Sequence, residues 1–569
     1  MFSFTRHGQK LLLQCFFDTF LTGLAAHAAF FFGNLSFHDD VVCTYDVGAT
    51  HIFGRFTLGL LGKLTRIPFG GSNYSLPWFN GFLSLVFLAL SAFLILRFLG
   101  ITSRVLSFLL CGILAVFPVL TATFAYGFTA PYYMFAFLLA VLGAILLVRG
   151  KSPVSFVAGI LVCGLMIGIY QAYLPVMLAM EILLLLADEF SGSFCPPAKT
   201  VSCPEPVSSR RSAWLPVWSR SLAGTGLGFC LYLVLMKLSL SLTGKELYAY
   251  RGLDTLGGGG NFSYPARILM AYRMFFNPDS FAAYRGSDDY LLFMWSIRAG
   301  YRLLVVLIFL LLGSVLFLQM KQRKKQGLPA FGFLIRSLVL FLLFPLCANF
   351  IFVMTDFDVY SLMLYGEVMI FVLALFLAGY LLPQKGFAPL FSALFQKEKA
   401  SVSAEKTASS GRAFPLPTGS LPGIFSLLAA GILVFAVLFY IRYDNLCYYK
   451  ADRMQEEAIA YDTALVSRIQ STEGYDPSLP VCFVHGLEKD TSFLADDPEL
   501  LRVTLTPYNG SEIINDYSWV SFLRIHCGYA PAVIEDAGQY DGYLEQEQVP
   551  RYPAPGSIRV LDDVILVNF

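Results

Sequence analysis

The chain has few charged residues, since Asp, Glu, Lys and Arg make up only 14% of its 569 positions. A soluble globular protein carries about 25%. Hydrophobic residues account for 56% of the chain, and the mean hydropathy is +0.64. This composition excludes an ordinary soluble domain and predicts a protein with many membrane-spanning segments. The formal net charge of +1 identifies no partner by itself, and no nucleic-acid partner is expected.

Paired cysteine motifs and phosphate-binding loops are also missing. The 11 cysteines show no C-x-x-C spacing, so neither a zinc site nor a disulfide framework is predicted. A bridge between Cys482 and Cys527 is one interpretation of the C-terminal region, and two free thiols are the preferred one. The four glycines at 257–260 have no preceding strand and no following Gly-Lys-Ser/Thr. They therefore predict a flexible loop rather than a nucleotide site.

Apolar runs near the twenty residues that a transmembrane helix needs recur along the chain. The first covers about residues 11–33. It resembles an uncleaved helix, because three phenylalanines at 30–32 continue the run past a possible signal-peptidase site at 26–28. The others cover about residues 76–98, 105–121, 131–148, 154–170, 172–186, 216–240, 301–320, 330–353, 361–382 and 421–441. The sequence thus predicts an α-helical polytopic membrane protein with about eleven transmembrane helices.

Basic residues gather in alternate connections between these spans, on the side that also holds Arg6 and Lys10. The positive-inside rule makes this side cytoplasmic, and an odd number of spans places the C-terminus outside. Residues 35–75 and 241–300 are then external loops. Two cytoplasmic segments rich in Ser, Pro and Lys, 190–215 and 383–420, are predicted to be disordered linkers.

The composition becomes that of a soluble protein after residue 441. Residues 448–471 are predicted to form a helix, 480–484 a buried strand, and 558–567 a hairpin-like pair of strands. We therefore divide the chain into a transmembrane domain, residues 1–441, and a small extracytoplasmic α/β domain, residues 442–569.

Two adjacent acids, Asp39 and Asp40, follow the first span directly. Acidic side chains at the membrane edge are costly and usually mark a functional site. A carboxylate fixed at a helix end can act as a general base. The alternative is a solvated pair that faces headgroups together with His38. Spacing does not identify the base, and the other acid could bind a sugar or a divalent metal. Asp356 and Asp358 are either a second acidic contact or, as we prefer, a polar turn.

Three arginines are candidates for binding a phosphate. Arg55 lies in an amphipathic stretch, residues 47–67, that predicts a helix in the outer membrane interface. Snorkelling of Arg55 to bulk headgroups is an equally good interpretation. Arg267 and Arg273 lie almost two turns apart in a predicted helix over 265–276, so they need not share a face. Either guanidinium could hold a phosphate in a bidentate manner.

Several short motifs occur in the same order as in a known family. They are Asp39-Asp40, Gly54-Arg55-Phe56, Leu-Pro-Trp-Phe-Asn-Gly at 76–81, Phe117-Pro118, Tyr126-Gly127-Phe128, Tyr-Gln-Ala-Tyr at 170–173 and the tail at 551–567. On these motifs the chain resembles the bacterial Gtr-type (type II) serotype-converting O-antigen glucosyltransferases. The resemblance implies a GT-C-like fold in the bacterial inner membrane. It also implies transfer of a sugar, glucose in the family, from undecaprenyl phosphate to a polysaccharide such as O-antigen.

The resemblance also implies roles for individual residues and partners. In the family the first external loop carries acids needed for activity, which correspond here to Asp39 and Asp40. We expect His38, Arg55 and Tyr126 to contact the substrates, with inversion at the anomeric carbon. No cofactor is expected with certainty, and a divalent metal stays open. Beyond the lipid-linked donor, the polysaccharide acceptor and the bilayer, a flippase and a donor-synthesising enzyme are candidate partner proteins.

Two other classes of function deserve comparison. A transporter or lipid flippase predicts inverted repeats and charged or broken helices near the membrane midplane. The sequence shows no obvious repeat, although Asp18 and Glu367 fall within predicted spans. A non-catalytic scaffold would use the external domain for interactions. Acids gathered in one external site favour the enzyme, whereas acids distributed through the membrane favour transport.

Overall fold

The computed structural model describes residues 6–43, 48, 50–69, 75–191, 214–248, 262–276, 291–355, 359, 361–382, 421–484, 513–515 and 517–569. Asp356 and Asp358, and most of the two predicted cytoplasmic linkers, lie outside these residues.

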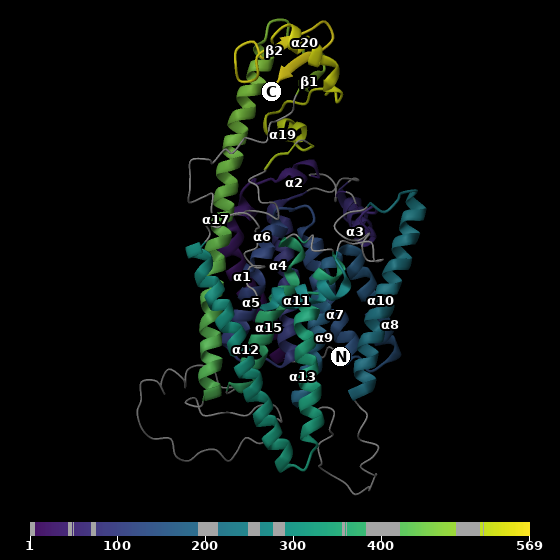
Figure 1. Ribbon diagram of the computed structural model, residues 1–569, viewed down its shortest axis with the longest axis vertical. Coiled ribbons are helices and arrows are strands. Elements are labelled where there is room, and N and C mark those ends of the chain that lie inside the picture. The colour runs from purple at the N-terminus through teal and green to yellow at the C-terminus, as the bar shows by residue number, and fades with distance from the viewer. Residues whose placement is uncertain are drawn as a thin grey trace.

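A bundle of long helices forms the larger part of the protein (Figure 1). Eight helices of the described chain are long and apolar enough to cross a membrane. They are α1 (Arg6–Phe32), α4 (Pro77–Leu99), α5 (Arg104–Val116) continued by α6 (Pro118–Phe124), α7 (Ala130–Arg149), α10 (Trp214–Thr243), α12 (Leu291–Lys325), α13 (Ala330–Ala348) and α17 (Leu421–Ser471). Shorter helices complete the bundle: α8 (Pro153–Ile169), α9 (Leu174–Ser191), α14 (Ile351–Met354) and α15 (Val368–Leu381). All the predicted spans coincide with helical segments, while the count of eleven stays a prediction.

Sequence signals explain where the helices break. The span predicted over 105–121 is divided, because Pro118 begins α6 after Phe117 adopts an extended conformation. Proline lacks the N–H that would continue the α5 hydrogen-bond ladder. Ser152 caps α8 by accepting a hydrogen bond from the backbone N–H of Ser155 at 3.1 Å. Tyr170 ends α8 in an extended conformation and leads into a short 3-10 turn, Gln171–Tyr173.

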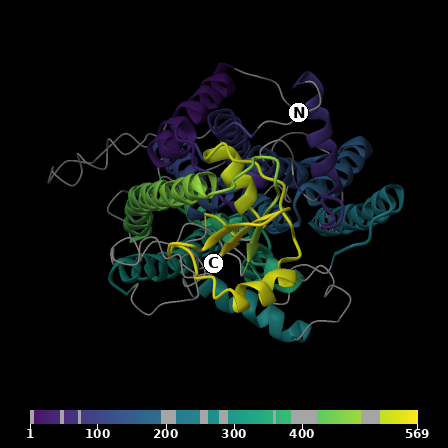
Figure 2. The same ribbon diagram turned by 90° about the horizontal axis from the view of Figure 1, so that it is seen from above.

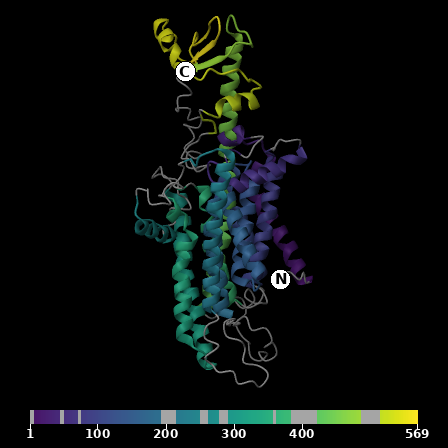
Figure 3. The same ribbon diagram turned by 90° about the vertical axis from the view of Figure 1, so that its right-hand side faces the viewer.

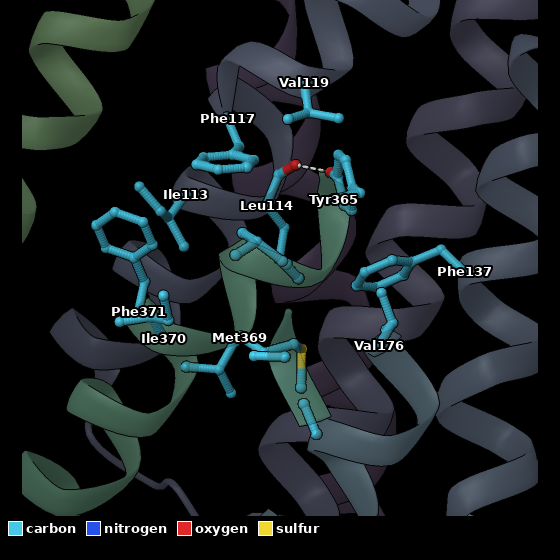
Figure 4. Packing of buried hydrophobic residues seen from close by; sticks show 14 of the residues in the cluster. Ile113, Leu114, Phe117, Val119, Phe137, Val176, Tyr365, Met369, Ile370 and Phe371 are labelled. Carbon is cyan, nitrogen blue, oxygen red and sulfur yellow. Dashed lines mark hydrogen bonds between the residues drawn. The ribbon is translucent and has the colours of Figure 1, made fainter. Parts of the chain in front are cut away.

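Aromatic and aliphatic side chains fill the centre of the bundle, where α5, α6, α7, α9 and α15 meet (Figure 4). The hydroxyl of Tyr365 donates to the carbonyl oxygen of Leu114. The rings of Phe117 and Phe137 pack edge-on against Tyr365, with centroid distances of 6.0 and 5.1 Å. Within a membrane such close packing, rather than the hydrophobic effect, holds helices together.

Three acidic side chains buried in the bundle have donors that compensate for the loss of water. Asp18 accepts a bidentate pair of hydrogen bonds from Arg104. Glu189 accepts two from Arg336, at 2.6 and 3.1 Å. Glu181 accepts from two hydroxyl groups of α10, at 2.7 and 2.6 Å. These three acids are therefore parts of helix-to-helix contacts.

The last bundle helix, α17, continues beyond the bundle and carries the C-terminal domain (Figure 1). It has 51 residues, so it is about 75 Å long. The predicted helix over 448–471 is its outer part, and the proposed boundary at 441 falls inside it. A three-stranded sheet follows, in the order β1 (Val481–Val484), β3 (Ile565–Asn568), β2 (Ile558–Val560). β3 pairs parallel with β1 and antiparallel with β2, which confirms the predicted strands.

Short helices complete the C-terminal domain, and its thiols are unpaired. α19 (Trp519–His526) and α20 (Asp541–Gln546) pack beside the sheet. Cys482 and Cys527 are both free. The interpretation of these two cysteines as free thiols is thus confirmed.

The two ends of the bundle differ. The C-terminal domain lies over one end, together with the short helices α2 (His38–Val42) and α3 (Phe56–Arg66), and the connection between α12 and α13 lies at the other (Figures 1 and 3). Seen along the long axis, the C-terminal domain covers the middle of the helix ends (Figure 2). The orientation relative to the cytoplasm stays a prediction.

Candidate functional site

The acidic pair lies on α2, a helix of five residues that follows α1 after a short extended segment. His38, Asp40 and Val41 are buried, whereas the side chain of Asp39 is 34% exposed. Neighbouring residues on a helix point about 100° apart. The two carboxylates therefore have different surroundings.

Asp40 points into the protein. Its Oδ1 accepts hydrogen bonds from the backbone N–H of Phe128 at 3.0 Å and from the hydroxyl of Ser75 at 3.1 Å. Burial raises the pKa of Asp40 to about 7, against the effect of these two hydrogen bonds, and the charge of Asp39 acts in the same direction as burial. This carboxyl group fixes α2 to the turn after α6.

The Tyr126-Gly127-Phe128 motif forms that turn. The ring of Tyr126 stands edge-on to the imidazole of His38, at 6.2 Å between centroids. The side-chain amide of Asn80 donates to the carbonyl oxygen of Gly127 at 2.9 Å. A Cβ atom on Gly127 would lie 3.1 Å from the Phe30 ring and 3.4 Å from Asp40 Oδ1. Glycine thus allows the turn to approach the acidic helix closely.

Asp39 lies at the surface of the site. Its Oδ1 accepts a hydrogen bond from the hydroxyl of Tyr517, and it lies 3.0 Å from His38 Nδ1. Burial alone would raise the pKa of Asp39, but hydrogen bonds from His38 and Tyr517, with the charges of His38 and Arg55, lower it. Among the described residues no hydrogen bond reaches Oδ2. Asp39 is therefore a partly exposed, ionised carboxylate whose Oδ1 is held by His38 and Tyr517.

Arg55 precedes α3, which is shorter than predicted. The amphipathic stretch 47–67 predicts a helix, but the structure has helix only from Phe56. Gly54 interrupts it with a φ of +67°, a left-handed conformation that suits glycine. A Cβ atom at Gly54 would lie 2.6 Å from the hydroxyl of Tyr232. The resulting turn directs Arg55 toward the bundle.

Tyrosines hold the Arg55 guanidinium. Its Nη1 donates to the hydroxyl of Tyr133 at 3.1 Å, and its Cζ lies 4.6 Å above the ring of Tyr170. The two tyrosine rings stack at 4.4 Å with an interplanar angle of 7°. The charge of Arg55 also contributes to the lowered pKa of Asp39.

The other predicted cations do not share this position. Arg267 is buried in α11 (Tyr264–Phe276), where its Nε donates to the carbonyl oxygen of Phe262 at 3.0 Å. Arg273 is exposed on the same helix, so the two arginines face different surroundings. α11 packs mainly against α13 and α14, whereas α3 packs against α8 and α10. The packing of these helices gives no support for grouping Arg267 or Arg273 with Arg55. Asp356 and Asp358 lie outside the described residues.

Sequence reasoning missed three partners of the site. Tyr517 is 478 residues from Asp39 along the chain, and no motif connects them. Ser75 contributes a hydroxyl group, and Tyr133 a hydroxyl group and a ring stacked on Tyr170; the sequence gives no signal for either role. The described residues contain no group of three or more His, Cys, Asp or Glu side chains placed to hold a metal ion.

Comparison with protein families shows a match over much of the chain. The family model described as "Glucosyl transferase GtrII" matches residues 28–371, which is more than half of the chain. The matched part includes α2, Arg55 and α11, ends within α15, and leaves out the C-terminal domain. Neither the curated proteins nor the solved structures give a match.

Proposed function

The chain belongs to the GtrII glucosyl transferase family, a family of membrane glycosyltransferases, and on that premise we propose its donor, acceptor and catalytic residues. The donor is a polyprenyl phosphate sugar, undecaprenyl phosphate glucose, and the acceptor is a hydroxyl of a cell-surface polysaccharide such as O-antigen. The reaction takes place on the outer face of the bacterial inner membrane, in a GT-C-like bundle whose N-terminus is cytoplasmic. The observation that carries the proposal is the partly exposed carboxylate of Asp39, held at Oδ1 by His38 and Tyr517 on a helix that the buried Asp40 fixes to Phe128.

Asp39 acts as the general base. Its Oδ2 takes the proton of the acceptor hydroxyl while that oxygen bonds to the anomeric carbon of the donor. The bond between this carbon and the phosphate oxygen breaks on the opposite side, so the configuration inverts and polyprenyl phosphate leaves. With a pKa below its ordinary value, Asp39 is unprotonated near neutral pH, as a base must be. Asp40, buried against Phe128, positions the helix that carries Asp39.

Arg55 binds the leaving phosphate. A guanidinium offers a planar pair of donors that matches phosphate oxygens, and the stacked Tyr133 and Tyr170 restrict its orientation. Leu60 and Leu64 of the neighbouring α3 are exposed. In a bilayer these side chains would face hydrocarbon, which suits a lipid donor whose tail cannot leave the membrane.

The test is sugar transfer by the purified full-length protein in lipid vesicles, with a defined polyprenyl phosphate sugar and a saccharide acceptor. We expect Asp39→Asn to lower turnover about a hundredfold or more, because the amide keeps the shape but cannot accept the proton. Asp40→Asn is the matched control. Its amide oxygen can still accept from Phe128, so most activity remains. Full activity of Asp39→Asn would exclude Asp39 as the base, and Asp356 or Asp358 would be tested next.

A further inference from the structure

The C-terminal domain reaches into the candidate site. We propose that Tyr517 is a positioning residue of the transfer reaction, which holds Oδ1 of Asp39 so that Oδ2 is presented to the acceptor hydroxyl. This inference rests on the proposed role of Asp39 as the base. Tyr517 lies outside residues 28–371, to which the family match is confined.

The contact geometry supports a polar rather than a packing role for Tyr517. Its hydroxyl donates to Asp39 Oδ1 and lies 2.8 Å from His38 Nδ1. The ring stands edge-on to the imidazole of His38, at 5.9 Å between centroids. Yet 60% of Tyr517 is exposed. A residue so exposed contributes little to a hydrophobic core, and its hydroxyl makes the specific contacts.

The backbone that carries Tyr517 is fixed on both sides. Ser518 N donates to Asn515 Oδ1 at 3.1 Å, and Asn515 N donates to Ser518 Oγ at 2.9 Å. Directly after this turn, Trp519 Nε1 of α19 donates to Asp462 Oδ1 of α17 at 3.0 Å. The turn therefore has a defined place relative to α17, and α19 packs against α2.

The C-terminal region also holds the segment between α1 and α2. The side chain of Gln455, on α17, accepts from Ser36 N and donates to the carbonyl oxygen of Asn34, both at 2.8 Å. His526, on α19, places its Nε2 3.0 Å from the hydroxyl of Ser36. Together with Tyr517 these contacts attach the chain before and within α2 to the same domain. The C-terminal domain therefore forms part of the candidate site.

Loss of the Tyr517 hydroxyl changes Asp39 in two ways. Only His38 then remains to hold Oδ1, so the carboxylate can rotate and Oδ2 spends less time in line with the acceptor. The lost hydrogen bond is also one that lowers the pKa of Asp39. The titratable or charged groups around this carboxylate are His38 and Asp40 on α2, Arg55 before α3, and Tyr517 itself. His526 approaches the same segment through Ser36.

The experiment compares Tyr517→Phe with the wild-type protein in the vesicle assay above. We expect kcat to fall about tenfold, since small misplacements of a catalytic group have effects of this order or larger. The KM for the donor stays unchanged. In the pH profile of kcat/KM, the acidic limb moves to higher pH, because loss of the Tyr517 hydrogen bond raises the pKa of Asp39. The melting temperature stays unchanged, since phenylalanine retains the ring of an exposed residue.

Tyr540→Phe, in the same domain, is the matched control. No described residue forms a hydrogen bond with its hydroxyl, so none of these quantities changes. If Tyr517→Phe retains the wild-type kcat and acidic limb while Asp39→Asn is inactive, the inference on Tyr517 is wrong and the proposed function stands. A lower kcat with a lower melting temperature and an unmoved limb also overturns it, because the role is then structural. If Asp39→Asn itself is active, the proposed function fails.

Discussion

Asp39 and Asp40 show how two neighbouring carboxylates acquire different chemistry. The carboxyl group of Asp40 is buried against the turn at Phe128 and shielded from water. This burial raises the pKa of Asp40 to about 7. Asp39 keeps part of its exposure and gains His38 and Tyr517 as partners, which lower its pKa. Hydrogen bonds and opposite charges favour an ionised carboxylate, and burial disfavours it. In the proposed function the exposed residue transfers the proton and the buried one positions its helix.

Arg55 has a planar guanidinium whose fixed orientation an ammonium cannot reproduce. We expect Arg55→Lys to lower kcat/KM for the lipid donor about tenfold or more, because lysine keeps the charge but loses both the paired donors and the stacking on Tyr170. Steady-state transfer at varied donor concentration measures this change.

Arg273→Lys is the matched control for Arg55→Lys, since its side chain is exposed on α11 and should tolerate the exchange. Normal activity of Arg55→Lys would mean that Arg55 anchors the interface to bulk headgroups. Impaired transfer by Arg273→Lys in the same assay would instead indicate that the phosphate binds at α11.

At the scale of helices and strands, the sequence predicts most of the fold because apolar length is a local property. Runs of about twenty apolar residues coincide with bundle helices, and the short runs at 480–484 and 558–567 coincide with β1 to β3. The extent of α3 was not predicted, since the amphipathic pattern continues through Gly54 while the backbone there is left-handed. A periodic pattern of apolar side chains does not reveal that the Tyr232 hydroxyl occupies the space that a Cβ atom at position 54 would need.

Contacts between residues distant in sequence could not be predicted from apolar length or periodicity. The arginine that binds the side chain of Asp18, Arg104, is 86 residues away in the sequence. The acids of the site were identified from their cost at the membrane edge, and Arg55 from its motif. Tyr517 lies in a different domain, so only the fold brings it to Asp39.

Gly54 provides a test of the turn that places Arg55. Alanine at this position is strained by the φ of +67° and would lie 2.6 Å from the Tyr232 hydroxyl. We expect Gly54→Ala to lower the free energy of unfolding by about 1 kcal/mol or more and to reduce transfer as Arg55→Lys does. Thermal unfolding in detergent and the transfer assay measure the two effects.

Gly226→Ala is the control for Gly54→Ala. A Cβ atom at Gly226, within α10, meets nothing within 4 Å, and alanine favours helix. This variant should retain stability and activity. Equal behaviour of the two variants would show that the turn at Gly54 does not depend on its left-handed conformation.

At the scale of the whole molecule, the site lies where the bundle meets the C-terminal domain. α17 belongs to both parts: its Gln455 accepts from Ser36 N in the segment before α2, and its Asp462 accepts from Trp519 Nε1 of α19. Three acids inside the bundle, Asp18, Asp188 and Glu189, pair with arginines of other helices and so join helices to one another. This arrangement favours an enzyme with one site at the bundle end over a transporter.

The orientation of the bundle decides whether that site faces outward. Basic residues at the connection of α12 and α13, and at the ends of α4 and α7, predict that their end of the bundle is cytoplasmic. Because the C-terminal domain lies at the opposite end (Figure 1), we expect it outside the cytoplasm. A reporter active only outside should therefore function when fused after Phe569. A cytoplasm-only reporter should function when inserted after Gln326, which serves as the matched site. Activity of the cytoplasm-only reporter at Phe569 would place Asp39, Arg55 and Tyr517 on the inner face, where the proposed externally facing donor could not reach them.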